Sequence, residues 1–250
     1  MRIVRCVLWA AALSGASVSR AITVDELIAK NVEARGGLAK LRAIETLRLE
    51  GTRTRLGGGF EMPFVEIRKR PGAIRSEATM QGLTMIRAYD GKEGWAVQPF
   101  RGRKDPEKLP ADAAKQLAYD ADLDGPLVDY KEKGNQVEYL GTEDVDGTEA
   151  HKVQVTRPTG DVEMIYLDPD YFLEIRRLSR YRVRGAETEI ETDFGGYERV
   201  NGVYFPFSIE SGSPGSREKG QKINVNKAEA NVTVDDAIFH FPGDAAPAAK

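Results

Sequence analysis

The 250-residue sequence has few of the residues that most often carry chemistry. It contains one cysteine, Cys6, and two histidines, His151 and His240. A lone cysteine excludes an internal disulfide, so stability must come from an ordinary hydrophobic core. Neither histidine belongs to a metal-spaced group, and each is interpreted as a half-buried strand residue. Nucleophile motifs such as Gly-x-Ser-x-Gly and phosphate-cradling glycine loops are also missing, so we expect no enzymatic activity and no cofactor.

The sequence also lacks an excess of positive charge. Its net charge is −3, and loss of the first twenty-one residues would remove three arginines and make the charge more negative. Nucleic-acid binding needs a basic face, because phosphates must be neutralised. We therefore expect no nucleic-acid partner.

No hydrophobic run is long enough for the roughly 20 residues of a membrane span. The first residues instead resemble a cleavable signal peptide. Arg2 and Arg5 precede a short apolar run at residues 6–13, and Ser19-Arg20-Ala21 offers small residues at a cleavage site. We expect cleavage after Ala21 and an exported mature chain without cysteine or a lipid anchor. Residues 22–242 are expected to form one domain, followed by a flexible tail at 243–250.

Strand signals dominate the mature chain. After a capped helix that begins near Thr23 and a second helical turn at 38–44, apolar and polar residues alternate from Thr46. Segments at hairpin spacing follow, separated by turns such as Asn201-Gly202. Gly195-Gly196 suggests a bend or bulge in a strongly curved sheet. The pattern predicts a mainly β fold with one antiparallel sheet.

The segment from Tyr171 to Val200 predicts a long hairpin with Arg184-Gly185 at its tip. The register of this hairpin is predicted from the match of opposite charges and from the separation of polar and apolar residues between the two faces. It pairs basic with acidic residues on one face and places apolar and small residues on the other. The expected pairs are Arg182 with Glu187, Arg180 with Glu189, Arg176 with Asp193, Val183 with Ala186, Tyr181 with Thr188, Ser179 with Ile190, and Ile175 with Phe194. A solvated sheet face is the favoured interpretation of the charges, and a docking surface is the alternative.

One long segment, Asp105 to Lys133, lacks strand signals. Helices are expected at 111–117 and at 127–131, and together they form a candidate lid or plug over the concave face of the sheet. Between them, Asp120, Asp122, Asp124 and Gly125 match the first half of a calcium loop. The twelfth position is Lys131, so the closing carboxylate is missing. We therefore expect no metal, and interpret the turn as a solvated helix cap.

Aromatic, methionine and aliphatic residues lie on apparently two-sided strands. Core packing explains most of them, and the remainder could line a deformable pocket for acyl chains. By alternation and placement, the candidate lining residues are Phe64, Met80, Met85, Trp95, Phe205 and Phe207, and the candidate lid residues are Leu127, Val128 and Tyr130.

These segments, in this order and spacing, resemble the LolA-like group of periplasmic proteins, the outer-membrane lipoprotein-sorting proteins. The resemblance rests on residues 36–44, 70–72, 89–95, 122–130, 166–169 and 201–206, among them Tyr89-Asp90-Gly91 and Tyr166-Leu167-Asp168-Pro169. It implies an incomplete barrel whose concave apolar face is covered by helices and accepts lipid chains. It also implies a periplasmic location. The cavity-gating arginine of the known carriers has no assigned counterpart in this sequence.

Three functions follow as hypotheses. The first is a monomeric, non-covalent carrier or binding protein for lipid or lipoprotein acyl chains. The second is an envelope sensor that contacts a membrane-protein partner through its charged hairpin. The third is a hydrolase with an unrecognised site, which would need a pocket holding two carboxylates or a buried histidine within hydrogen-bond reach, and which an all-apolar cavity would exclude.

Overall fold

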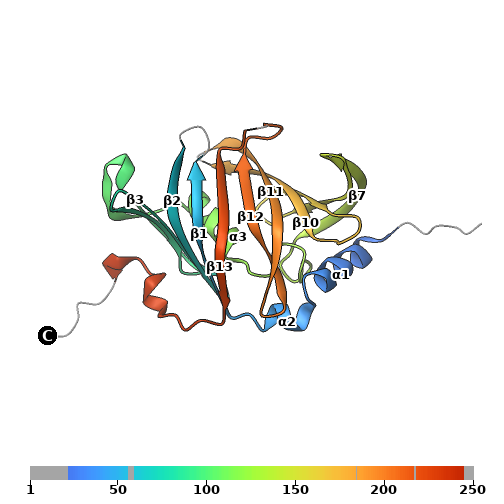
Figure 1. Cartoon of the computed structure of the whole chain (residues 1–250), viewed down its shortest axis with the longest axis horizontal. Helices are drawn as coiled ribbons and strands as arrows, with labels where there is room; N and C mark the ends of the chain where they lie inside the picture. The colour runs from blue at the N-terminus through green and yellow to red at the C-terminus, as the bar shows by residue number, and fades with distance from the viewer. Residues whose placement is uncertain (1–21, 56–58, 184, 217, 245–250) are drawn as a thin grey trace, which may run out of the picture.

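The structure, a computed structural model, describes residues 22–55, 59–183, 185–216 and 218–244 (Figure 1). The expected signal peptide, residue Arg184 of the hairpin tip and residues 245–250 of the expected tail lie outside these ranges. The elements are, in chain order, α1 (Val24–Ala34), α2 (Leu38–Arg42), β1 (Thr46–Arg55), β2 (Phe60–Lys69), β3 (Ala73–Met80), β4 (Leu83–Tyr89), β5 (Gly94–Gln98), η1 (Pro99–Arg101), β6 (Arg103–Lys108), α3 (Ala111–Ala121), β7 (Gln136–Val145), β8 (Thr148–Thr156), β9 (Val162–Leu167), β10 (Glu174–Val183), β11 (Ala186–Val200), β12 (Val203–Gly212), β13 (Gln221–Ala230), η2 (Asp236–Ile238) and η3 (Pro242–Asp244).

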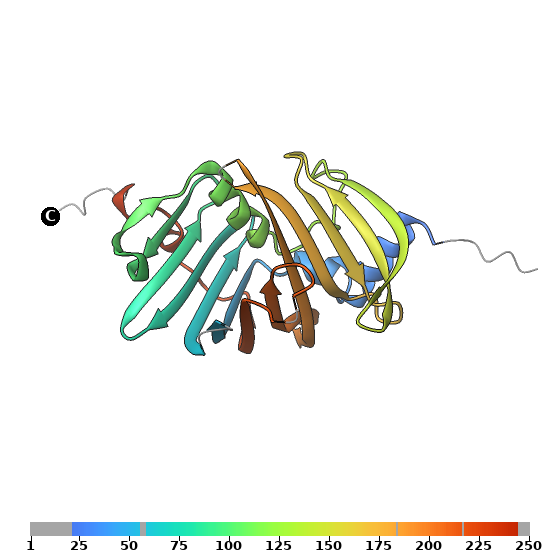
Figure 2. The ribbon, with the colours of Figure 1, turned by 90° about the horizontal axis from the view of Figure 1, so that it is seen from above.

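All thirteen strands form a single antiparallel sheet. Their order is β6-β5-β4-β3-β2-β1-β13-β12-β11-β10-β9-β8-β7, so nearly every neighbour in space is also a neighbour in sequence, and β1 with β13 joins the two halves. The sheet bends strongly but β6 and β7 do not pair (Figure 2). This confirms the predicted mainly β fold, an incomplete barrel.

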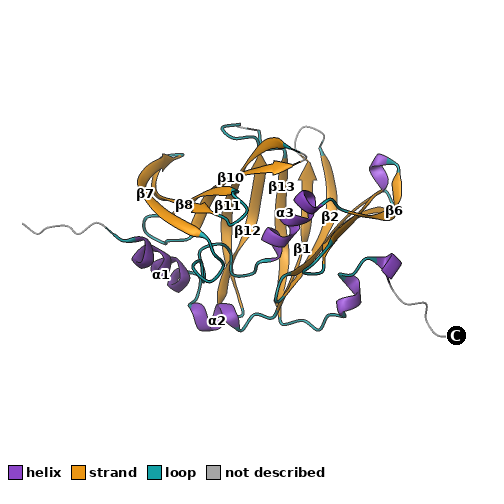
Figure 3. Cartoon of the chain, turned by 180° about the vertical axis from the view of Figure 1, so that it is seen from behind, coloured by secondary structure: helices purple, strands orange, loops and turns teal. Residues whose placement is uncertain are grey.

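The two faces of the sheet differ in what covers them. The concave side, here called the inner face, carries Leu47 and Leu49 of β1 and Phe64 of β2. Two clusters form on it: one joins β1, β2, β12 and β13 to α2, and the other joins β8 and β9 to α1. Helix α3 lies within the curve of the sheet against β3, β4 and β5 (Figures 2 and 3). The hydrophobic core therefore lies between the sheet and these covering elements.

The N-terminal helix begins as predicted. The Thr23 side chain accepts from the Glu26 N–H, and the Glu26 carboxylate accepts from the Thr23 N–H, which satisfies two of the free donors of the first turn. The helix ends at Ala34 and is followed by Gly36, where φ is +122° and a Cβ atom would lie 2.3 Å from the Gly202 carbonyl oxygen. Only glycine permits this contact, which seats α1 and α2 on the β11–β12 turn.

The predicted register of the long hairpin is confirmed. Arg182 pairs with Glu187, Arg180 with Glu189, Arg176 with Asp193, Val183 with Ala186, Tyr181 with Thr188, and Ser179 with Ile190. Arg177 and Ser179 lie on the inner face, so the three predicted arginine–carboxylate pairs, which alternate with them, occupy the outer face. Of the bend or bulge expected at Gly195-Gly196, the bulge is absent, because β11 keeps one register with β12 from Glu191 to Val200. Gly196 adopts a positive φ within this strand.

Two expectations for the segment between strands need correction. Residues 103–108 form strand β6, which pairs with β5, so the irregular segment begins after Lys108. Residues 127–131 form turns and not a helix, because Asp129 has φ +51° and ends any helical path. The first expected helix is confirmed as α3, four residues longer than predicted. Within the described residues, no helix is long and apolar enough to cross a membrane.

Candidate functional site

A cavity of about 380 Å³ opens on the inner face of the sheet. Its wall includes residues of α3, of the segment that follows α3, and of strands on both sides of the β1–β13 junction. Pockets for small ligands measure roughly 300–1,000 Å³, so this inner cavity has a suitable size.

Part of the wall is apolar. Leu47 and Leu49 of β1 lie beside Phe64 of β2 and Ile223 and Val225 of β13. Leu123, Phe205 and Ile209 extend the same surface. These side chains belong to or pack against one core cluster. They form an apolar floor, defined by Leu47, Leu49, Phe64, Leu123, Phe205, Ile209, Ile223 and Val225.

The rest of the wall is charged. Glu66 of β2 receives hydrogen bonds from Arg68 on the same strand, at 2.8 Å from Nε. Arg177 of β10 forms a two-pronged pair with Glu174, at 2.6 and 2.7 Å, and these pairs together with nearby Glu163 raise its pKa against the opposing effect of burial. The cavity is therefore amphipathic and not uniformly apolar.

Further pairs fix the segment after α3. Arg70 holds the Asp124 carboxylate, and Lys133 holds Asp122 at 2.6 Å. Arg35, which directly follows α1, donates to the backbone oxygens of Leu123 and Asp124. These contacts stabilise an irregular segment that has no secondary structure of its own.

The three aspartates of the calcium-like sequence thus point in different directions. Asp122 contacts Lys133, Asp124 contacts Arg70, and Asp120 lines the inner cavity. Within the described part of the chain, no group of three or more metal-ligating side chains gathers.

The structure brings together some of the predicted lining residues. Phe64 and Phe205 are buried and lie in the cavity wall. Phe207 packs half-buried against the same core cluster, beside the wall. Ala78 of β3 pairs with Phe64 of β2 and with Met85 of β4, so Met85 lies on the inner face. Met80 lies two residues after Ala78 on β3 and therefore on the same face. Neither methionine lines the cavity, because both lie nearer the β3–β4 turn.

Trp95 is placed elsewhere, which corrects the prediction for this residue. It pairs with Ala88, and Ala88 pairs with Arg75, so all three lie on the outer face. The indole N–H donates to the Phe239 carbonyl at 2.7 Å, and the guanidinium of Arg75 lies 5.3 Å from the ring centroid. The C-terminal segment therefore buries Trp95 on the side opposite the cavity.

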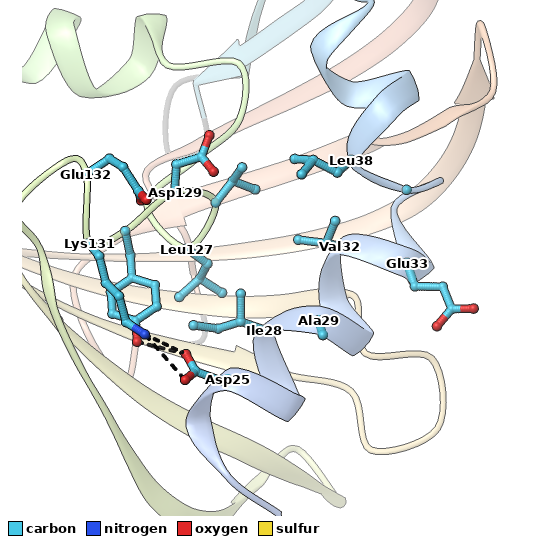
Figure 4. Close-up of a pocket in the computed structure, with 13 residues that line it drawn as sticks. Asp25, Ile28, Ala29, Val32, Glu33, Leu38, Leu127, Asp129, Lys131 and Glu132 are labelled. Carbon is cyan, nitrogen blue, oxygen red and sulfur yellow. Dashed lines mark hydrogen bonds and ion pairs between the residues drawn. The ribbon is translucent and has the colours of Figure 1, made fainter.

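The predicted lid residues form one wall of a second cavity, here called the α1 groove (Figure 4). This groove measures about 460 Å³ and lies between α1 and residues 127–132. Leu127 faces Ile28 across it and also lines the inner cavity, whereas Val128 and Tyr130 line only the groove. The Tyr130 hydroxyl donates to Asp25 at 2.9 Å, which ties this segment to α1.

Both histidines have ordinary structural partners. His151 Nδ1 lies 3.0 Å from the Tyr139 hydroxyl and its ring stacks on Phe172. His240 Nδ1 lies 3.0 Å from the Asp90 carboxylate, but this residue is exposed in a bend after η2, so its interpretation as a half-buried strand residue is wrong. Neither lines the inner cavity.

Sequence reasoning missed the arginines of the inner face. Arg53, Arg68, Arg87 and Arg177 all line the cavity. Strand alternation could have identified Arg53, because residues 47, 49 and 53 lie on the same face of β1 and Arg53 must therefore share the inner face with Leu47 and Leu49.

No protein-family model matches the sequence, and no curated protein matches it. Solved structures do resemble the fold. A DUF1329 family protein from Desulfovibrio piger superposes with a TM-score of 0.58 at 13% identity, over 87% of this chain and 97% of that one. A LolA superfamily protein from Nitrosomonas europaea gives 0.58 at 14% identity, over 88% and 98%. A domain assigned to the outer membrane lipoprotein-sorting proteins, from Vibrio parahaemolyticus, gives 0.55 at 10% identity, over 87% and 97%. The chain therefore has a LolA-like fold.

Proposed function

We propose that this protein is a periplasmic binding or carrier protein that holds a hydrophobic or acylated ligand in the inner cavity without covalent chemistry. The observation that carries the proposal is the apolar floor, which lines a cavity of about 380 Å³ inside an open sheet. The names of the structural neighbours support it, since one is a LolA superfamily protein and another is assigned to lipoprotein sorting.

The physical basis of affinity would be burial of methylene groups. Each buried methylene contributes about 0.8 kcal/mol, so ten of them would provide about 8 kcal/mol before the cost of association is subtracted. Because the sheet is not closed between β6 and β7, an acyl chain would reach the apolar floor without unfolding of the protein.

The polar part of the wall favours binding over hydrolysis. Glu66 and Glu174 each contact an arginine directly, so these carboxylates are already engaged in ion pairs. The cavity holds no histidine among its wall residues. A non-catalytic role therefore accounts best for these groups.

The test measures ligand binding directly. Mature protein is purified, its co-purifying molecules are identified by native mass spectrometry, and uptake of a fluorescent fatty acid is titrated. Ile209→Trp, which fills the floor, is expected to weaken uptake about tenfold or more, whereas Leu140→Trp on the exposed part of β7 should bind like wild type. Thermal unfolding shows whether each variant folds. Absence of both retained lipid and fatty-acid uptake would contradict the proposal.

A further inference from the structure

The charges of the inner cavity do not balance. Five arginines and six carboxylates lie in its wall. Three of the carboxylates are neutralised by cations from outside the wall: Asp122 by Lys133, Asp124 by Arg70, and Glu163 by Arg157. The wall arginines are Arg35, Arg53, Arg68, Arg87 and Arg177, and the wall carboxylates without a cation from outside the wall are Glu66, Asp120 and Glu174. Arg177 additionally lies 3.8 Å from Glu163. The wall has an excess of positive charge.

The excess lies at side chains that lack partners. Arg53 Nε and Gln116 Nε2 are buried without a hydrogen-bond acceptor. Among the residues that the structure describes, Arg87 also makes no hydrogen bond or ion pair within 4.0 Å. An unsatisfied buried donor is costly, and a charged one more so. An acceptor supplied by a ligand in this cavity would satisfy Arg53 Nε and Gln116 Nε2.

Register explains how these groups meet. Arg87 of β4 pairs with Ser76 of β3, which pairs with Glu66 of β2, so the three share one row of the inner face. Arg53 lies on β1, two residues beyond Gly51, the partner of Phe64. Gln116 reaches the same cavity from α3.

The unpartnered donors adjoin the apolar floor. The Arg53 guanidinium lies 4.9 Å from the centroid of the Phe64 ring, which belongs to the floor. Burial lowers the pKa of Arg53, and the charge of Arg87 adds to this effect against the opposing charge of Glu66. A ligand that neutralises Arg53 would relieve this burial cost.

We propose that the ligand is an anionic amphiphile whose carboxylate or phosphate head group accepts hydrogen bonds from Arg53 and Gln116 near the charge of Arg87, while its chain lies on the apolar floor. The inference rests on the proposed function and names the chemical class of its ligand. Asp120 of α3 also faces this wall, makes no hydrogen bond or ion pair in the described part of the chain, and opposes an anion.

The experiment compares probes that differ only in head-group charge. Dansyl-labelled undecanoic acid and its methyl ester are titrated against the full mature chain by fluorescence. The acid is expected to bind about tenfold more tightly than the ester, or better, because only the acid can form a charge-assisted hydrogen bond with Arg53. Equal binding of the two probes would overturn the head-group assignment and leave the proposed function intact. Binding of neither would overturn both.

Variants locate the head group. Arg53→Gln should weaken acid binding about tenfold and leave ester binding unchanged, Asp120→Asn should strengthen acid binding, and Arg180→Gln, on the outer face, should change neither. Equal loss of acid and ester binding in Arg53→Gln, with thermal unfolding unchanged, would assign Arg53 a packing role and contradict the inference.

A final arm separates a lipid head group from a simple anion. Dodecyl phosphate should displace the labelled acid, whereas inorganic phosphate at the same concentration should not, because it lacks a chain for the floor. Equal displacement by both would show a site for free phosphate and overturn the amphiphile assignment.

Discussion

Arg70 holds Asp124 through two hydrogen bonds of 2.6 Å, one from each terminal nitrogen. The same guanidinium donates to the backbone oxygens of Ile44 and Leu41. One side chain at the end of β2 thereby fastens α2 and the segment after α3, which together cover the inner face. The pair is mostly buried, with 10% of the Asp124 side chain exposed.

Breaking this pair should destabilise the fold. Asp124→Asn leaves the Arg70 charge without its partner, so the free energy of unfolding should fall by about 3 kcal/mol, measured by urea denaturation. The exposed pair of Arg42 and Asp129 is the control, and Arg42→Ala should cost less than ~1 kcal/mol. Similar losses in both variants would contradict the assigned role.

The same pair predicts an acid-labile contribution to stability. Burial alone would raise the pKa of Asp124, but the hydrogen bonds and charge of Arg70, with help from Lys133, hold it below the ordinary value of 3.8. A carboxylate with a depressed pKa stabilises the fold fully above its unfolded pKa, and this stabilisation is lost as pH falls through the folded value. Denaturation curves below pH 4 should therefore lose less stability in Asp124→Asn than in wild type.

Substitutions of Gly36 and Gly37 would distinguish the cost of a steric clash from the cost of backbone strain. Both residues have positive φ. A Cβ atom at Gly36 would lie 2.3 Å from the Gly202 carbonyl oxygen, whereas a Cβ atom at Gly37 would have no atom within 4 Å. Gly36→Ala should lower the melting temperature more than Gly37→Ala, whose cost is confined to backbone strain of about 1–3 kcal/mol at φ +92° and ψ 150°. Equal effects would mean that the contact of α1 with the β11–β12 turn does not limit stability.

Lys219 and Lys222 offer a second matched pair on the outer face. The Lys219 side chain is 8% exposed and contacts both Glu191 and Asp193, the latter at 3.1 Å. Lys219→Met should cost about 3 kcal/mol in unfolding free energy, because it leaves Glu191 without its closest cation. Lys222→Met, which breaks a more exposed pair with Glu210, should cost less than ~1 kcal/mol. The reverse ranking in urea denaturation would refute this account.

His151 predicts a weak pH dependence near neutrality. Burial, and then the charge of Lys30, lowers its pKa from the ordinary value of 6.5. The unfolded chain therefore binds a proton first as pH falls, and stability declines from pH 6.5 toward the folded pKa. His151→Gln should flatten the profile in this window. A folded-state titration by nuclear magnetic resonance with a midpoint above 6.5 would reverse the sign and disprove the prediction.

Local patterns predicted much of this fold because local physics determines it. The charges from Arg176 to Asp193 favour one register, since a shift of one residue would remove the charge match and the separation of the two faces. Asn201-Gly202 predicted its hairpin because both residues accept a positive φ.

The site depended on contacts between distant parts of the chain. Trp95 follows an inward-looking pattern but is covered by Phe239, 144 residues away, and no local signal specifies that contact. The 127–131 segment looked helical from its apolar spacing, yet its conformation is set by partners such as Asp25. The cavity arginines could have been recognised from strand alternation, whereas their lack of partners could not.

An incomplete barrel leaves two strands, β6 and β7, with unpaired backbone groups along one side. Such edges invite pairing between molecules, and proteins avoid it with charges, proline and bulges. Strand β6 reads Arg-Lys-Asp-Pro-Glu-Lys and is almost wholly exposed, and β7 is interrupted by an irregularity between Tyr139 and Thr142. The charges and proline of β6 and the irregularity of β7 are features that disfavour edge-to-edge pairing of such open sheets.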